Sequence, residues 1–198
     1  MQETHDNFDS GLISCTKKIL DLLDQNPTPV ILIDGQGASG KSTFAQLLQD
    51  EIFRETRLAP RVIHMDELYP GWDGLQAGSS YLHDVVLGPI SNKKVAHYQI
   101  WDWENGHRGS ELEPGNGWRE FSGGNLLIVE GCGSLSKANS ELADLRIWIS
   151  SDRTTRFSRW HERDQGKFDP YFVTWELQEQ EFYKENDSAL LADIKISN

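Results

Sequence analysis

Five short apolar runs alternate along the chain with longer stretches in which apolar residues recur at helical spacing. The first run, VILID, lies between Pro29 and Gly35 and is apolar at nearly every position, which is typical of a strand buried on both faces of a parallel sheet. Strands that alternate with helices predict βαβ units. We therefore expect an α/β fold around a parallel sheet of about five strands, formed by residues 30–34, 61–65, 126–130, 146–150 and 192–197.

The clearest helical spacing lies on either side of the first strand, at apolar positions between 12 and 23 and between 44 and 52. The segment 70–124 is the least regular part of the chain and is dense in Gly, Trp and charge, which is typical of a functional, loop-rich insertion. No internal repeat divides the chain, so we expect a single domain over 1–198. Further helices are expected around 78–92, 136–144, 152–165 and 170–187.

Charge and composition narrow the class of protein. The chain has 198 residues and a net charge of −12, which argues against a protein that grips a nucleic acid polymer. No apolar run approaches the roughly 18 residues that a membrane span needs. The polar, acidic start is not a signal peptide, and two cysteines form no disulfide framework. We expect a cytoplasmic protein without a membrane partner; a homo-oligomer is compatible with the sequence.

The octapeptide GQGASGKS at 35–42 leaves the first predicted strand and opens the next helix, and it fits the pattern G-x-x-x-x-G-K-[ST]. Glycines let successive backbone N–H groups turn toward an anion, and the helix N-terminus adds partial positive charge. In this pattern the lysine reaches the β- and γ-phosphates and the hydroxyl binds Mg²⁺, which are the roles expected of Lys41 and Ser42. The predicted nucleotide-binding residues are Gly35, Gly37, Ala38, Ser39, Gly40, Lys41, Ser42 and Thr43.

Asp66 directly follows the second predicted strand, at the edge where open α/β sheets place their ligands. A carboxylate at this point can accept the proton of an acceptor hydroxyl or hold the water shell of a metal ion. The alternative is an acidic helix cap.

A cluster of arginines follows the fourth strand. Arg156, Arg159 and Arg163 have the spacing i, i+3 and i+7, so a helix places them on one face. Guanidinium groups bind phosphate oxygens in pairs and keep their charge. We interpret residues 152–170 as a lid whose arginines neutralise charge on a transferred phosphoryl group; a salt-bridged surface helix is the alternative.

Other classes of nucleotide-binding protein fit less well. A GTPase normally carries an Asn-Lys-x-Asp motif, and the nearest string, at 92–95, lacks the Asp. The string FSGGN at 121–125 looks like the motif of ABC-type ATPases, but it directly precedes a strand and is interpreted as a turn.

Taken in order, the motifs resemble uridine kinase and its relatives among the P-loop nucleoside and nucleotide kinases. The resemblance runs from about Pro29 onward and rests on ASGKS, the Asp-x-x-Tyr of 66–69, WDW at 101–103, Glu-Gly at 130–131 and TRFSRWHERD at 155–164. It implies a three-layer P-loop NTPase fold with an arginine-bearing lid helix, Asp66 as the base, and Glu130 as an acidic residue that helps to position Mg²⁺. The residues that it places at the acceptor are Tyr69, Trp101, Asp102, Trp103, His107 and Arg108.

Together these features predict an ATP-dependent phosphotransferase with an alcohol group as acceptor, first a nucleoside such as uridine or cytidine. A kinase for a nucleoside monophosphate, sugar acid or vitamin is one alternative, and a nucleotide-binding regulatory protein without turnover is another. ATP and GTP are not distinguished. The predicted catalytic residues are Lys41, Asp66, Arg156, Arg159 and Arg163, and the predicted Mg²⁺ residues are Ser42, Glu130 and Asp66.

The last long predicted helix carries Tyr171, Trp175 and Phe182 at helical spacing, which we interpret as a stripe that packs on the core. Its glutamates are expected to form a solvated face: Glu176, Glu179, Glu181 and Glu185. His64 is expected to be structural, and Cys132 is given no chemical role.

Overall fold

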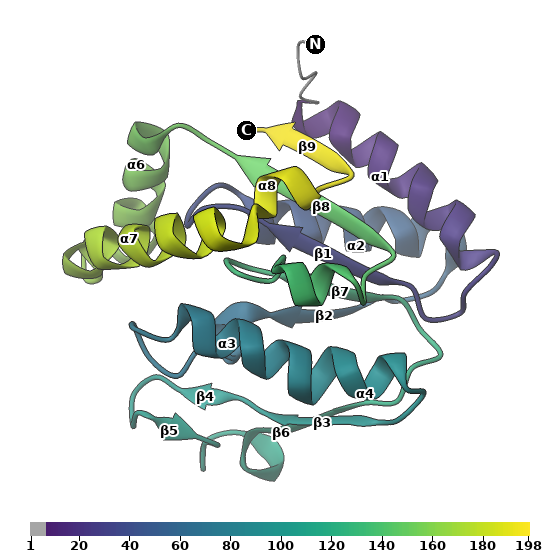
Figure 1. The fold of residues 1–198 in the computed structure, drawn as a ribbon, viewed down its shortest axis with the longest axis horizontal. Helices are drawn as coiled ribbons and strands as arrows, with labels where there is room; N and C mark the ends of the chain where they lie inside the picture. Colours follow the sequence, from purple (N-terminus) through teal and green to yellow (C-terminus); the bar gives the residue numbers. More distant parts are fainter. Residues whose placement is uncertain (1–6) are drawn as a thin grey trace.

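The computed structural model describes residues 7–198. A sheet of five parallel strands lies at the centre, in the order β2-β7-β1-β8-β9 (Figure 1). All five predicted strands are present, with small differences at their ends. Their bounds are β1 Val30–Asp34, β2 Arg61–His64, β7 Leu127–Glu130, β8 Leu145–Ser150 and β9 Ile194–Ser197.

Helices cover both faces of the sheet, which confirms the three-layer α/β arrangement. Strand β1 shows why: alternate side chains point to opposite faces, and both faces are buried. Ile31 and Ile33 pack in the core with residues of α1 (Phe8–Leu23) and α2 (Lys41–Thr56). Leu32 belongs to the opposite core, to which α3 (Leu75–Tyr81) and α7 (Asp169–Asn186) contribute.

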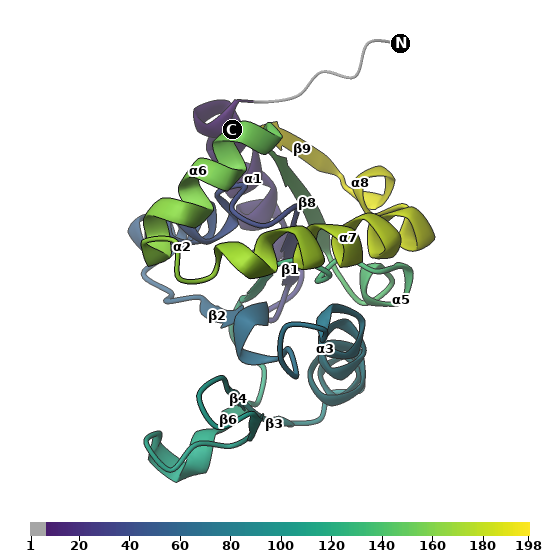
Figure 2. The same ribbon diagram turned by 90° about the vertical axis from the view of Figure 1, so that its left-hand side faces the viewer.

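The chain between β2 and β7 lies beyond the β2 edge of the sheet, away from β9 (Figures 1 and 2). The helix expected around 78–92 is present, because helical structure runs from α3 through a π-helical stretch (Leu82–Leu87) into α4 (Gly88–Ser91). The rest of the segment is more ordered than the sequence predicts. Two small antiparallel sheets follow, and their strands have only two to four residues, too few for a clear alternation. They are β3 (Ala96–Gln99) with β6 (Trp118–Phe121) and β4 (Trp101–Asp102) with β5 (His107–Arg108), with a 3-10 turn at Pro114–Gly117.

After β8 the chain forms the expected arginine-bearing helix, α6 (Arg153–Asp164), and then α7, which passes the carboxyl ends of β1 and β8 (Figure 2). The helix expected at 136–144 is shorter, because α5 spans Lys137–Ser140, and a short α8 (Ser188–Leu191) precedes β9. Within 7–198, no helix combines the length and apolar character that crossing a bilayer requires.

Candidate active site

The loop Gly35–Ser42 connects β1 to α2, as the motif predicts. Gly35 has a φ of +145°, and a Cβ there would collide with the carbonyl oxygen of Ile149, so the loop passes β8 too closely for a side chain. Gly40, with a φ of +102°, leads directly into α2. The N-cap residue of this helix is Gly40, and no side chain among the described residues makes a capping hydrogen bond there. The N–H groups at the start of α2 therefore lack a side-chain acceptor from a capping residue.

Lys41 is buried under this loop. Its Nζ donates to the carbonyl oxygens of Gly35 and Gln36, each at 2.8 Å, and lies 3.5 Å from Cys132 Sγ. Burial by itself lowers the pKa of Lys41, but the groups around the ammonium, Cys132 and Glu130 first among them, outweigh burial and raise the pKa above its ordinary value. The lysine is therefore charged, and its charge lies inside the protein.

Ser42 and Glu130 meet at the end of the central strands. Ser42 Oγ donates to Glu130 Oε1 at 2.9 Å, and the same oxygen lies 2.6 Å from His64 Nδ1. Strand pairing of β2 with β7 sets His64 beside Glu130. The hydrogen bond to Glu130 raises the pKa of His64. His64 thus has a direct partner in the site, a role that goes beyond the structural one expected.

Asp66 lies in a short 3-10 turn, Met65–Glu67, directly after β2. The Trp103 indole donates to the backbone carbonyl of Asp66 at 2.8 Å, while the Asp66 side chain is exposed. Although the residue is exposed to solvent, neighbouring protein groups partly desolvate its carboxylate, and this desolvation, ahead of the charge of Glu130, raises the pKa of Asp66, while Arg163 lowers it. Asp66 therefore lies in the same electrostatic environment as the predicted metal residue and the lid.

The three lid arginines are on α6, but their surroundings differ. Arg156 is buried, and its NH2 donates to Glu176 Oε1 at 3.0 Å. Arg159 is half-buried, and its NH1 has no hydrogen-bond partner within residues 7–198. Arg163 lies at the exposed end of the helix, where its Nε pairs with Asp164 at 2.7 Å. Their predicted role at the transferred phosphoryl group stays a prediction.

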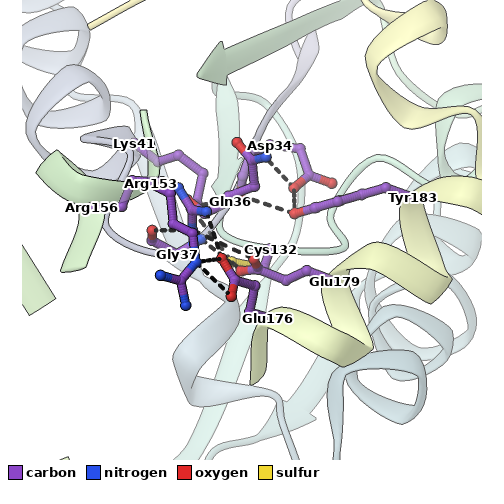
Figure 3. Close-up of polar contacts among 11 residues, drawn as sticks. Asp34, Gln36, Gly37, Lys41, Cys132, Arg153, Arg156, Glu176, Glu179 and Tyr183 are labelled. Carbon is purple, nitrogen blue, oxygen red and sulfur yellow. Dashed lines mark hydrogen bonds and ion pairs between the residues drawn. The ribbon is translucent and has the colours of Figure 1, made fainter. Parts of the chain in front are cut away.

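Two of the four glutamates of α7 are not solvated, which corrects the expectation for this face (Figure 3). Glu176 pairs with Arg153 and is mostly buried. Glu179 is fully buried: its Oε1 accepts from the backbone N–H of Gly37 at 2.6 Å and from Cys132 Sγ at 3.1 Å. A carboxylate from α7 is thus hydrogen-bonded to the phosphate loop.

The spacing of Glu179 along α7 indicates that it is buried, although we expected it on the solvated face. Glu179 lies four residues after Trp175 and three before Phe182, which is the spacing of the stripe that packs on the core. The buried stripe of α7 consists of Phe172, Trp175, Glu179 and Phe182. Tyr171, which we expected in it, is 40% exposed instead.

Asp34, the last residue of β1, is fully buried and was not predicted as a site residue. Its carboxylate accepts from the backbone N–H groups of Gly35, Gly133 and Leu135. It also accepts from the hydroxyl of Tyr183 (Figure 3). Burial raises its pKa to about 6, against the lowering effect of these donors. A charged residue that ends an apolar strand just before a glycine loop is the signal in the sequence.

Two predicted acceptor residues have structural roles in the structure. Tyr69 is fully buried and its hydroxyl donates to the carbonyl oxygen of Cys132 at 2.6 Å, so its ring belongs to the core. Asp102, the last residue of β4, is buried and accepts from Asn105 in the turn that follows; these hydrogen bonds lower its pKa to about 2. Trp101, beside it in β4, is half-buried.

Arg108 also makes its contacts within the protein. Its guanidinium stacks 3.5 Å above the Tyr81 ring and donates to the carbonyl oxygens of Gln99 and Leu68. His107 is exposed, with its Nδ1 3.0 Å from the carbonyl oxygen of Arg108. The predicted contact of His107 with an acceptor stays a prediction.

Trp72 joins the insertion to the lid. Its ring stacks on Tyr171 at 4.3 Å and lies 5.1 Å from Trp103, 6.0 Å from Trp160 and 6.2 Å from Trp175. Trp103 comes from the insertion, whereas the other three rings come from α6 and α7. The aromatic cluster therefore connects the insertion, next to Asp66, with α6 and α7.

Comparison with known proteins establishes the fold of the chain. No known family profile and no curated protein matches the sequence. The chain is similar to a structure described as a possible uridine kinase from Bacillus stearothermophilus, with 17% identity, a TM-score of 0.65, and 95% of this chain and 98% of that chain covered. It is also similar to a structure described as a putative fructose transport system kinase from Silicibacter, with 17% identity, a TM-score of 0.58, and 94% of this chain and 98% of that chain covered.

A D-glycerate 3-kinase from Cryptococcus neoformans matches with 12% identity, a TM-score of 0.51, and 80% of this chain and 79% of that chain covered. At these identities the similarity establishes the fold alone. It confirms the architecture that the resemblance to the uridine kinase family implies. The chain thus has the three-layer α/β fold of the P-loop kinases.

Proposed function

We propose that the protein is an ATP-dependent kinase that transfers the γ-phosphoryl group to a hydroxyl of a small, uncharged acceptor, first a nucleoside. The observation that carries the proposal is the hydrogen bond of 2.9 Å between Ser42 and Glu130. A glycine turn without a ligand has no need of a carboxylate beside its serine. With Lys41 and Asp66 at the same edge of the sheet, the loop has the charges that phosphoryl transfer uses.

The oxygens of Ser42 and Glu130 are of the kind that Mg²⁺ prefers, and they fit such an ion with Asp66 nearby. In the part of the chain that the structure describes, no three His, Cys, Asp or Glu side chains form a metal cluster. A Mg²⁺ ion in a nucleotide site needs only one or two carboxylates, because water and phosphate oxygens fill its other positions. When bound, the ion neutralises charge on the phosphates.

The chain's own residues would then divide the work. Lys41 releases the carbonyl oxygens of Gly35 and Gln36 and turns to the phosphates. Asp66 accepts the proton of the acceptor hydroxyl, and the raised pKa of its carboxyl group makes it the stronger base. Arg159 has a buried donor to offer to a phosphate oxygen. Positioning and electrostatics supply the catalysis.

The arginines on the acceptor side favour an uncharged acceptor. A monophosphate or a sugar acid needs a free cation at its binding site. Arg108 stacks on Tyr81 and donates to two backbone carbonyl oxygens, and Arg119 forms an ion pair with Glu113 at 2.8 Å. Trp103, in contrast, presents a ring that is 41% exposed beside Asp66, which suits the flat face of a base or sugar.

The test is a screen for ADP release with purified protein, ATP and Mg²⁺ against nucleosides, nucleoside monophosphates, sugar acids and vitamins, with Lys41→Ala as the control. Release with nucleosides that the control lacks supports the proposal. Release only with monophosphates or sugar acids contradicts the uncharged acceptor. ATP binding without turnover on any acceptor contradicts the kinase and leaves a nucleotide-binding regulatory protein.

A further inference from the structure

Glu179 occupies an unusual position for a carboxylate in a site that binds anions (Figure 3). Its Oε1 accepts from the Gly37 N–H, a backbone group of the phosphate loop. Its Oε2 lies 3.9 Å from Arg156 NH1 and has no hydrogen-bond partner among the described residues. The side chain is only 2% exposed, so its charge is not screened by water.

The positive charges that surround Glu179 are those that a triphosphate needs. Lys41 is buried under the same loop, and Arg156 donates to the carbonyl oxygen of Gly37, although at a long 3.4 Å. Glu179 therefore accepts from the N–H of Gly37, and Arg156 donates to the carbonyl oxygen of the same residue. With no phosphate present, Glu179 balances part of this positive charge, together with Glu176, which pairs with Arg156 at 3.0 Å. A bound triphosphate brings several negative charges to the same place.

The packing around Gly37 shows that α6 and α7 lie tightly on the loop. A Cβ at Gly37 would come within 3.2 Å of Glu179 Oε1 and 3.3 Å of the Trp160 ring. The carboxylate is thus held closely against Gly37. A cavity of about 360 Å³ lies beside it.

This cavity can receive the carboxylate. Glu179 and Arg156 both line it, together with Gln36, Glu176 and Tyr183. Arg156 Nε is buried without a hydrogen-bond partner in the described chain, and the Gln36 amide is a further donor. A Glu179 side chain that rotates away from Gly37 would therefore find donors, which lowers the cost of moving a charged group inside the protein.

We propose that Glu179 is a resident counter-anion of the phosphate loop: it holds the empty loop through Gly37 and is displaced into the adjacent cavity when a triphosphate binds. The proposal rests on the proposed nucleotide binding and adds a residue that sets the affinity. It makes Glu179 a positioning residue, because it acts on the loop and not on the transferred group.

The experiment compares Glu179→Gln with Glu176→Gln. Both variants remove one negative charge from the same face of α7 and the same cavity, but only Glu179 is hydrogen-bonded to the loop. Glutamine keeps an acceptor for the Gly37 N–H, so the loop keeps its contact. Dissociation constants for ATP, ADP and AMP are measured by calorimetry, with Mg²⁺ and without an acceptor.

Glu179→Gln is expected to bind ATP at least about tenfold more tightly than the natural protein, ADP with a smaller gain and AMP with none, because the repulsion grows with phosphate charge. Glu176→Gln is expected to gain clearly less than Glu179→Gln, because Glu176 pairs with Arg153 and Arg156 but does not contact the phosphate loop. Without nucleotide, Glu179→Gln is expected to unfold at a lower temperature, since the buried cations lose their counter-charge.

Unchanged or weaker ATP binding by Glu179→Gln overturns the inference while the proposed function stands. An equal gain in Glu176→Gln overturns it too, because the effect would then be one of net charge alone. If neither the natural protein nor Glu179→Gln binds ATP, the proposed function fails and the inference fails with it.

Discussion

The carboxylate of Asp34 connects the phosphate loop, the segment after β7 and Tyr183 of α7. Replacement of Asp34 by asparagine tests whether the pKa of this carboxyl group is raised in the folded protein. The side chain is fully buried, and burial raises its pKa from 3.8 to about 6. Because the folded protein holds this proton more tightly than the unfolded chain, the contribution to stability is present below about pH 4 and is lost as pH rises through about 6.

The size of the effect follows from the shift. A difference of about 2 pKa units corresponds to about 3 kcal/mol between pH 4 and pH 7, and full burial leaves little solvent screening to reduce it. The amide introduced by Asp34→Asn cannot titrate. The variant also loses an acceptor for the Leu135 N–H, which adds a cost of about 1–3 kcal/mol that does not vary with pH.

The measurement is urea unfolding of both proteins at intervals from pH 4 to pH 7.5. The free energy of unfolding of the natural protein, minus that of Asp34→Asn, is expected to fall by about 3 kcal/mol over this interval. Asp102→Asn is the control, because the lowered pKa of Asp102 places its own change below the interval. Parallel curves for the natural protein and Asp34→Asn would refute the raised pKa of Asp34.

Three further predictions concern the proposed reaction and the lid. Asp66→Asn is expected to keep ATP affinity and to lose at least about 100-fold in turnover in the ADP-release assay, and near-normal turnover would remove Asp66 from the base role. Arg159→Ala is expected to lower kcat more than it raises the KM for ATP, whereas a change confined to KM would contradict a role in the transition state. Trp72→Ala is expected to lower the free energy of unfolding by about 2–4 kcal/mol, as measured in urea. The exposed Trp118, changed to Ala, is expected to cost less than about 0.5 kcal/mol, and equal costs for the two would show that the aromatic cluster contributes nothing.

The part of the site that comes from local sequence could be predicted. The residues from 30 to 42 form a strand, a turn and a helix start within one short segment, and the geometry needs glycines at fixed places such as Gly35 and Gly40. Because parallel strands end at one edge of the sheet, Asp66 and Glu130 also fall near the loop once the strands are placed.

Contacts between distant segments could not be predicted in the same way. Glu179 is 142 residues from Gly37, and only the position of α7 beside the carboxyl ends of the strands shows that its carboxylate is buried. Tyr69 follows the motif of the family, but its role depends on Cys132 on a neighbouring strand end. Partners of Arg108, among them the carbonyl oxygen of Leu68, also lie far from it in the sequence and could not be predicted.

The aromatic cluster has a practical consequence. Four of the seven tryptophans, Trp72, Trp103, Trp160 and Trp175, lie within it, and the rings of Trp160 and Trp175 also pack on Gly37 of the phosphate loop. The emission of an indole responds to the polarity and to the quenching groups around it. The protein therefore contains its own optical reporter, whose fluorescence follows any movement of α6 and α7 against the loop without an added label.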